Sequence, residues 1–237
     1  DIKYIFRCLD YNKVFDDKSD YNYDNVPTYL YDDNPWNDVQ YLFNKDIFID
    51  NTLGVVKYTL HGQKMPDMDQ YSSWAADHPV GKDYVLQNYS APARCEDQKE
   101  FTEKEAEIVR HNVEENVLDM VKAHPETTFY FYTPPYSALW WYKTKCSGNL
   151  KRYFQAEQLQ AELLLQYDNV KLFSFTDLFD LTCDLDNYKD DTHYSEQISA
   201  DIMNWIHDGT CQMTEANYKS RIENMTDYYL HYNYSKS

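Results

Sequence analysis

The chain has 237 residues, with 22 Lys and Arg against 40 Asp and Glu, which gives a formal net charge of −18. A surface of this charge repels phosphate backbones, so the composition excludes a nucleic-acid-binding protein. It also excludes a disordered chain, because 43% of the residues are hydrophobic and 17% are aromatic. The five glycines form no GxGxxG, Walker or GxSxG pattern, which excludes glycine-rich phosphate loops.

Residues 2–9 are apolar and partly β-branched, which predicts a buried first strand. The Asp-, Asn- and Tyr-rich stretch that follows, to about residue 37, predicts a loop. In it Asp20, Asn22 and Asp24 have the spacing that opens a calcium loop. Asn25 and Tyr31 stand where such a loop needs Gly and Glu, so a solvated acidic loop is the better interpretation.

Between residues 37 and 60 the apolar spacing is compatible with two short helices, and residues 61–98 read as irregular, with Trp74 and Tyr84 as anchors. The second half has a clearer pattern. Thr102 and Glu105 form a capping box, which opens a helix that runs to His124. Valines recur on that helix at one-turn spacing: Val109, Val113, Val117 and Val121.

Strands and helices then alternate to the end of the chain. Residues 128–133 and 170–175 predict buried strands, and Asn149 caps a helix between them. Ser195 caps a further helix, and Thr214 opens a last one. The last helix carries Tyr218, Ile222, Met225 and Tyr229 on one face.

This order predicts an α/β fold, a three-layer sandwich in which helices cover both faces of a mainly parallel sheet, with a carboxyl-terminal helix added. Ligands of such sheets bind beyond the carboxyl ends of the strands. Three segments leave those ends: residues 8–12, 133–137 and 177–193. We therefore look for chemistry in these three loops.

The five cysteines have no CxxC spacing, which argues against a zinc site. Cys8 lies in the first strand and is expected to be a small buried hydrophobe. If the protein is exported, the other four cysteines can form two bridges. We expect Cys95 to pair with Cys146, and Cys183 with Cys211. No run of 18 apolar residues is present, so no membrane span is expected.

Asp190 and His193, at the end of the third loop, carry the clearest chemical signal. A carboxylate three residues before a histidine can accept a hydrogen bond from one ring nitrogen and fix the tautomer in which the other nitrogen accepts a proton. This is the base half of a hydrolase triad. Two alternatives stay open: a helix-entry residue beside dipole-complementing aspartates, and a metal site of Asp190, Asp191 and His193, which no second histidine cluster supports.

The Asp190-x-x-His193 block before the last core helix, together with Thr133-Pro134-Pro135-Tyr136-Ser137 after an earlier strand, resembles the carboxyl-terminal part of the SGNH (GDSL-like) hydrolase superfamily. The resemblance covers roughly residues 1–207 and is nearest to the branch with DltD-like and polysaccharide O-acyl esterase or transferase proteins. It implies an SGNH-like, flavodoxin-like topology. It also implies one truncated α/β domain over 1–237, with 208–237 as a helical extension, in which Asp190 and His193 are catalytic.

The chain departs from this family at the nucleophile, because it has no Gly-Asp-Ser-like turn. The segment from Cys8 to Asn12 resembles the third family block, which implies that the first strand, the serine and the second block precede Asp1. Asp10 or Asn12 then takes the oxyanion position. Asn12 has the amide donor for that role, whereas an ionised Asp10 repels an oxyanion. An ordinary Asx turn after a strand is the alternative for both residues.

Four further residues are candidates for substrate binding: Tyr11, Tyr136, Ser137 and Trp140. Aromatic faces stack on sugars and acyl chains, but clustered aromatics also form cores. Ser137 is also a candidate nucleophile, although Pro134 and Pro135 differ from the strained glycine-flanked turn that exposes a catalytic hydroxyl.

The resemblance implies a serine esterase or O-acyltransferase without cofactor or metal, acting on an acylated cell-envelope or extracellular glycan. The expected location is extracytoplasmic, at the cell surface or secreted, with any anchoring segment outside this chain. The expected partners are an acylated carbohydrate or other ester and a membrane-bound acyltransferase. The alternative is a non-catalytic SGNH-like module that binds carbohydrate or such an acyltransferase. Because the serine is expected elsewhere, the chain alone is expected to be inactive.

Overall fold

The computed structural model describes residues 2–16, 26–64 and 79–234. The chain divides into two compact units, Asp1–Asp17 with His78–Ser237 and Lys18–Asp77. The larger unit contains the sheet and every candidate site residue. Trp74 and the acidic triplet at 20–24 lie outside the described residues.

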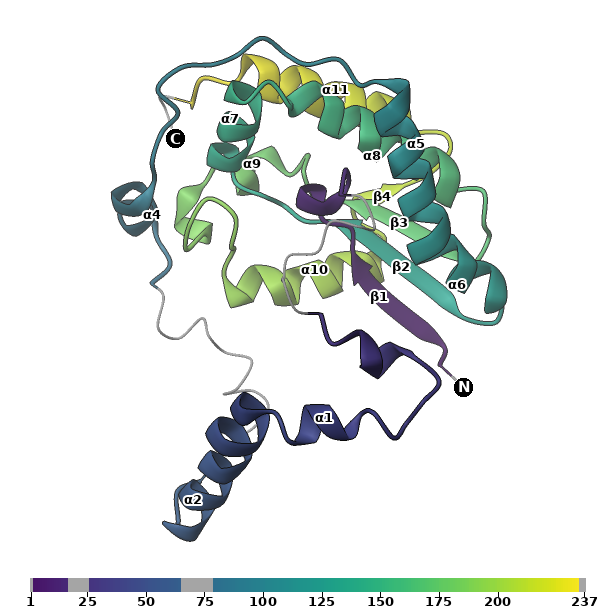
Figure 1. The fold of residues 1–237 in the computed structure, drawn as a ribbon. Coiled ribbons are helices and arrows are strands. Elements are labelled where there is room, and N and C mark those ends of the chain that lie inside the picture. The colour runs from purple at the N-terminus through teal and green to yellow at the C-terminus, as the bar shows by residue number, and fades with distance from the viewer. Residues whose placement is uncertain (1, 17–25, 65–78, 235–237) are drawn as a thin grey trace. The chain divides into compact units, whose positions relative to one another are not determined.

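A four-stranded sheet forms the centre of the larger unit, in the order β1 (Tyr4–Cys8), β2 (Thr128–Thr133), β3 (Val170–Ser174) and β4 (Gln212–Met213) (Figure 1). The first three strands are parallel, with Phe6 opposite Tyr130 and Phe131 opposite Leu172. The short β4 pairs antiparallel with β3. The prediction of an α/β fold with a mainly parallel sheet is therefore confirmed.

The helices of this unit lie between the strands in sequence, except α11, which follows β4. They are η1 (Tyr11–Lys13), α4 (Lys82–Asn88), α5 (Glu103–Val113), η5 (Glu114–Leu118), α6 (Asp119–Ala123), α7 (Ala138–Cys146), α8 (Leu150–Leu164), α9 (Phe179–Thr182), η6 (Leu185–Asn187), α10 (Glu196–Asp208) and α11 (Tyr218–His231). The helix predicted from Thr102 is confirmed with its capping box, and its middle segment η5 is a π-helix. All four of its spaced valines are buried.

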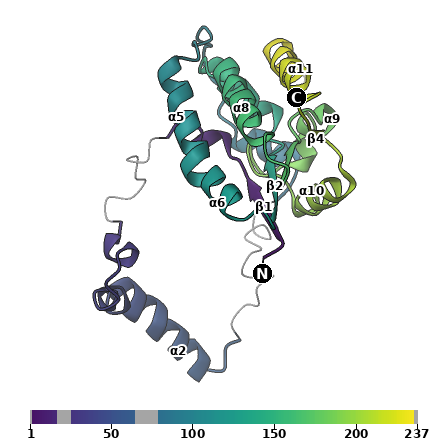
Figure 2. The same ribbon diagram turned by 90° about the vertical axis from the view of Figure 1, so that its right-hand side faces the viewer.

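The two faces of the sheet are covered by different helices because successive side chains of a strand point to opposite sides. Phe129, Phe131 and Leu172 pack in a core with α5, α7, α8 and α11. Phe173 and Phe175 face the other way and pack against Ile198, Ile202 and Ile206 of α10. Figure 2 shows α5 and α8 on one side of the strands and α10 on the other.

The first strand departs from its prediction. Instead of being buried, β1 lies at the end of the sheet, with Tyr4 61% and Phe6 46% exposed. Cys8, expected to be buried, is exposed as well. The reason is that α10 packs on β2 and β3 rather than on β1. On the outward face of β1, Phe6 stacks on Tyr130 of β2, with ring centroids 4.7 Å apart, and stays partly exposed.

The cysteine pairing is half right. Cys95 and Cys146 form a disulfide, which confirms the first pair. The second pair is wrong, because Cys183 and Cys211 are both free thiols. They lie in different surroundings: the Cys183 thiol contacts the hydroxyl of Tyr228 on α11, whereas Cys211 precedes β4 and its carbonyl accepts a bond from Arg221.

The smaller unit is helical in its described part. It contains η2 (Thr28–Tyr31), α1 (Val39–Leu42), the π-helical η3 (Asp46–Leu53) and α2 (Gly54–Leu60), so short helices form between residues 37 and 60 as expected. Many of their large apolar side chains are exposed, among them Phe43, Ile49 and Leu60. Among the described residues, no helix has the length and apolar character needed to cross a bilayer.

Candidate functional site

Three loops leave the carboxyl ends of the parallel strands close to one another. The backbone of Leu9, just after β1, donates to the carbonyl of Tyr132 at 2.8 Å. Phe175, just after β3, donates to the carbonyl of Thr133 at 3.3 Å. The loops that carry the predicted candidate residues therefore begin at one edge of the sheet.

Asp190 and His193 are in direct contact. One carboxylate oxygen of Asp190, Oδ2, lies 2.7 Å from Nδ1 of His193. The other, Oδ1, accepts hydrogen bonds from the backbone N–H groups of Thr192 and His193, both at 2.7 Å. The side chains stay accessible, with 43% of Asp190 and 55% of His193 exposed. The turn thus orients the carboxylate through three hydrogen bonds and leaves the pair at the surface.

The electrostatics of this turn favour an ionised carboxylate. Partial burial by itself raises the pKa of Asp190, but the hydrogen bonds from His193 and Thr192 stabilise the charged form and bring the pKa below its ordinary value. With Nδ1 donating to this carboxylate, the neutral imidazole carries its lone pair on Nε2. That is the tautomer a general base needs, and the carboxylate also stabilises the imidazolium that forms when Nε2 takes a proton.

The surrounding chain holds the turn in place. Tyr188 and Tyr194 form a β-bridge across its base, and Lys189 N–H donates to the carbonyl of His193 at 2.8 Å. The fully buried Tyr188 donates its hydroxyl to the carbonyl of Pro135 at 2.6 Å, which ties the third loop to the second. Ser195 caps α10 through the N–H of Ile198, as predicted.

Asp191 makes the other connection between these two loops. Its carboxylate forms an ion pair with Lys143 of α7 at 2.5 Å, and its carbonyl accepts a bond from the Ser137 hydroxyl at 2.7 Å. The ammonium of Lys143 also lies over the ring of Tyr89, 4.7 Å from its centroid. Asp191 is therefore engaged in holding the loop.

Asp10 and Asn12 form the Asx turn that the sequence left open as an alternative. The Asp10 carboxylate accepts a bond from the backbone N–H of Asn12 at 2.8 Å and caps η1. Asp10 also approaches the second and third loops. Burial is the main cause of the raised pKa of Tyr136, and the charge of Asp10 and its hydrogen bond to Tyr136 raise it further. Burial likewise raises the pKa of Tyr194, and the charge of Asp10 adds to the effect. Tyr194 follows His193 directly, so the first loop extends toward the Asp190–His193 turn.

The four residues proposed for substrate binding are buried. Tyr11, Tyr136 and Trp140 belong to the main core, where the Tyr136 and Trp140 rings lie 4.7 Å apart. Ser137 is fully buried and caps α7, its oxygen accepting from the N–H of Trp140. Burial of this kind is typical of packing residues. A substrate-binding role for these four stays a prediction.

Sequence reasoning missed three contributors to this region. Lys143 was missed because α7 was not predicted. Tyr194 was passed over although it adjoins His193. Glu157 had a visible signal, because it lies among Phe154, Ala161 and Leu164 on the apolar stripe of α8, and there it is 3% exposed. In the part of the chain that the structure describes, no group of three or more His, Cys, Asp and Glu is arranged to hold a metal ion.

Comparisons with known proteins add no assignment: no family model matches the chain, and no curated protein and no solved structure matches it.

Proposed function

We propose that this chain provides the acid–base half of an SGNH-like serine esterase or O-acyltransferase that acts on an acylated cell-envelope or extracellular glycan. The observation that carries the proposal is the Asp190–His193 hydrogen bond of 2.7 Å, in a turn at the carboxyl edge of a parallel sheet. His193 is the general base and Asp190 orients its ring. No metal or cofactor takes part in this chemistry.

The first loop supplies the oxyanion donor in this scheme. Asn12 suits the role better than Asp10, because an amide N–H stabilises a developing negative charge and a carboxylate opposes it. The Asp10 carboxylate has a different task, since it accepts the backbone N–H of Asn12 and so sets the conformation of the turn. The buried Tyr136 and Trp140 support the loops from below.

The serine belongs, in this proposal, to a segment upstream of Asp1. The place it can occupy is suggested by β1, which ends the sheet and has an exposed aromatic face. The faces of parallel strands are normally covered by the helices that connect them, so a further strand beside β1 would bring a connecting helix to this face. A further parallel strand beside β1 would end at the edge where the three loops begin, and a residue after that strand would approach the Asp190–His193 turn.

The proposed extracytoplasmic location has one structural support. The disulfide between Cys95 and Cys146 is typical of proteins that fold in an oxidising compartment.

Labelling with a fluorophosphonate, which reacts with activated serines, tests the proposal. The polypeptide expressed with the residues encoded before Asp1 should be labelled, and His193→Ala should abolish the labelling because the serine loses its base. His207→Ala is the matched control, since His207 is another exposed histidine with its Nδ1 2.9 Å from a carboxylate, that of Asp208. Equal labelling of all three proteins would exclude His193 as the base.

The chain of residues 1–237 alone should not hydrolyse a nitrophenyl ester. Hydrolysis by this chain, lost in His193→Ala, would place the nucleophile within it and overturn that part of the proposal.

The second candidate is a non-catalytic binding or scaffold module, which engages carbohydrate or a membrane-bound acyltransferase. The exposed apolar side chains of the smaller unit favour it, because such surfaces mark interaction sites. Calorimetric titration with an acylated glycan distinguishes the two candidates. A module binds without turnover, and its affinity is unchanged in His193→Ala.

A further inference from the structure

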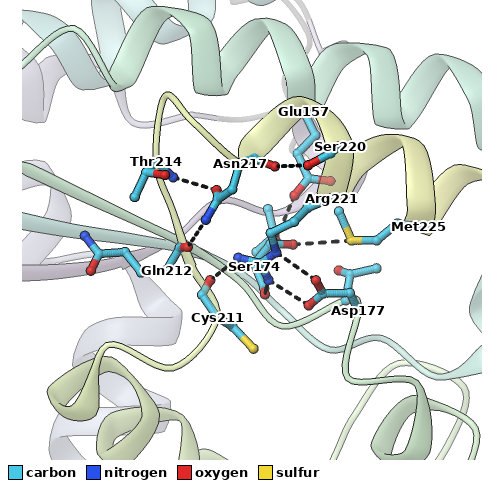
Figure 3. Close-up of polar contacts among 12 residues, drawn as sticks. Glu157, Ser174, Asp177, Cys211, Gln212, Thr214, Asn217, Ser220, Arg221 and Met225 are labelled. Atoms are coloured by element: carbon cyan, nitrogen blue, oxygen red, sulfur yellow. Dashed lines mark hydrogen bonds and ion pairs between the residues drawn. The ribbon is translucent and has the colours of Figure 1, made fainter.

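Glu157 is a buried carboxyl group that the proposed chemistry does not use. It lies on α8, 3% exposed, on the side that faces the sheet. Figure 3 shows it near Ser174 at the end of β3 and near Arg221 of α11. A buried carboxyl group is costly unless its oxygens are hydrogen-bonded, so its partners indicate what it does.

The partners of Glu157 come from all three strand ends. The Tyr11 hydroxyl, in the first loop, donates to Oε2 at 2.7 Å. Oε1 lies 3.1 Å from the hydroxyl of Thr133, the last residue of β2. Thr176, just after β3, lies 3.1 Å from the same Tyr11 hydroxyl. One side chain of α8 therefore connects the first loop to the ends of β2 and β3.

The hydrogen atoms in this network favour a protonated Glu157. The Thr133 hydroxyl has one hydrogen, and it also lies 2.8 Å from the Ser174 oxygen with geometry for donation. Ser174 in turn reaches the sulfur of Met225 at 3.7 Å. If Thr133 donates to Ser174, the contact between Thr133 and Glu157 needs a hydrogen from the carboxylic acid itself.

The charged groups near Glu157 do not favour its ionised form strongly enough to change this conclusion. Arg221 is the cation near Glu157, but its guanidinium is held by Asp177 through bonds of 2.8 and 2.7 Å. Burial raises the pKa of Glu157. The hydrogen bonds that Tyr11, Ser174 and Thr133 can donate to its ionised form, and the charge of Arg221, offset this only in part.

We propose that Glu157 is a positioning residue, which in its protonated form fixes the turn of Asp10, Tyr11 and Asn12 against the carboxyl ends of β2 and β3. It acts through Tyr11, whose ring is packed in the core and whose backbone lies between the two candidate oxyanion residues. The catalytic importance of this turn rests on the proposed function. The positioning of the turn by Glu157 does not depend on the proposed function, so the positioning role and the proposed function can be refuted separately.

Hydrogen exchange of the Asn12 amide tests this inference, because that N–H is bonded to Asp10 within the turn. Tyr11→Phe and Glu157→Ala should lower its protection factor about five- to tenfold, the effect of losing one buried hydrogen bond. Glu157→Gln should keep the protection, since the amide replaces the neutral acid. Glu162→Gln is the matched control, because Glu162 is a carboxylate of the same helix that pairs with Lys219 of α11 and makes no contact with Tyr11; it should match the unmodified protein.

The pH profile tests the protonated state. In the unmodified protein the protection factor should fall as the pH rises through the raised pKa of Glu157, and in Glu157→Gln it should stay constant. Protection unchanged in Tyr11→Phe would overturn the positioning role, even if Glu157→Ala fails to fold. A Glu157→Gln protein as unprotected as Glu157→Ala would overturn the protonated form.

Discussion

Removing the guanidinium of Arg221 should destabilise the larger unit strongly. Its Nε and Nη2 donate to the two oxygens of Asp177 at 2.8 and 2.7 Å, Nη1 donates to the carbonyl of Cys211 at 2.7 Å, and Nη2 also donates to the carbonyl of Ser174 at 2.9 Å (Figure 3). Both charged side chains are only 16% exposed. The group thus joins α11 to the end of β3, where the long loop with Asp190 and His193 begins.

The magnitude follows from what Arg221→Met leaves behind. The carboxylate of Asp177 stays buried without its cation, and two carbonyl oxygens lose their donor. Breaking a buried ion pair in this way costs about 3–5 kcal/mol of unfolding free energy. In a unit of this size such a loss lowers Tm by about 10 °C. Replacing both partners, as in Asp177→Leu with Arg221→Met, should recover part of the loss, because no buried charge is then unpaired.

Equilibrium unfolding in urea, followed by tryptophan fluorescence, measures this effect. Arg110→Met is the control, because Arg110 also pairs with two oxygen partners, Glu103 and Glu107, but on an exposed helix face. Its urea midpoint should hardly move. If the urea midpoint of Arg221→Met differs from that of the unmodified protein by no more than the midpoint of Arg110→Met does, the reasoning is refuted. The Arg221–Asp177 pair would then not be effectively buried.

Three further predictions concern stability. Asp190 has a lowered pKa, so its contribution to the free energy of unfolding is present at pH values above the ordinary carboxyl pKa and is lost as the pH falls through the native pKa. Urea titrations at a series of pH values should show that Asp190→Asn removes this loss of stability at low pH. Glu157 has a raised pKa, so its contribution to the free energy of unfolding is complete below the ordinary carboxyl pKa and declines as the pH rises through the native pKa. The same titrations on Glu157→Gln should show no such decline. An equal decline in the unmodified protein and in Glu157→Gln would contradict a buried acid. Cys95→Ser should cost about 4 kcal/mol, because the bridge to Cys146 closes a loop with a sequence separation of 51, and a thermal scan that shows no loss would mean that the bridge does not form.

Local patterns allowed most of the helices and strands to be predicted. The capping box at Thr102 and Glu105 satisfies backbone groups within one turn, so four consecutive residues are enough to predict the start of α5. The helix α7 was not predicted, because its first four residues, Ala138 to Trp141, are all buried and so show no alternation of apolar and polar positions. The exposure of β1 was missed for another reason. Whether a strand is covered depends on where α10 packs, and that is decided by distant residues.

The candidate site divides in the same way. Asp190 and His193 are three residues apart, so their hydrogen bond follows from the local turn and could be expected from spacing. Lys143 is remote in sequence from its partner Asp191, and Glu157 is 146 residues from Tyr11, so the fold alone brings these partners together. An ionisable residue in an apolar helical stripe, as at Glu157, nevertheless indicates a buried polar network.

The central claim is that Asp190 and His193 act as the orienting acid and the general base of an ester-cleaving site. The most direct measurement is kcat/KM for nitrophenyl acetate hydrolysis by the polypeptide that includes the residues encoded before Asp1, compared among the unmodified protein, His193→Ala and His207→Ala. The account predicts a loss of at least about 10³-fold for His193→Ala and no change for His207→Ala. Equal activity in the two variants would contradict it.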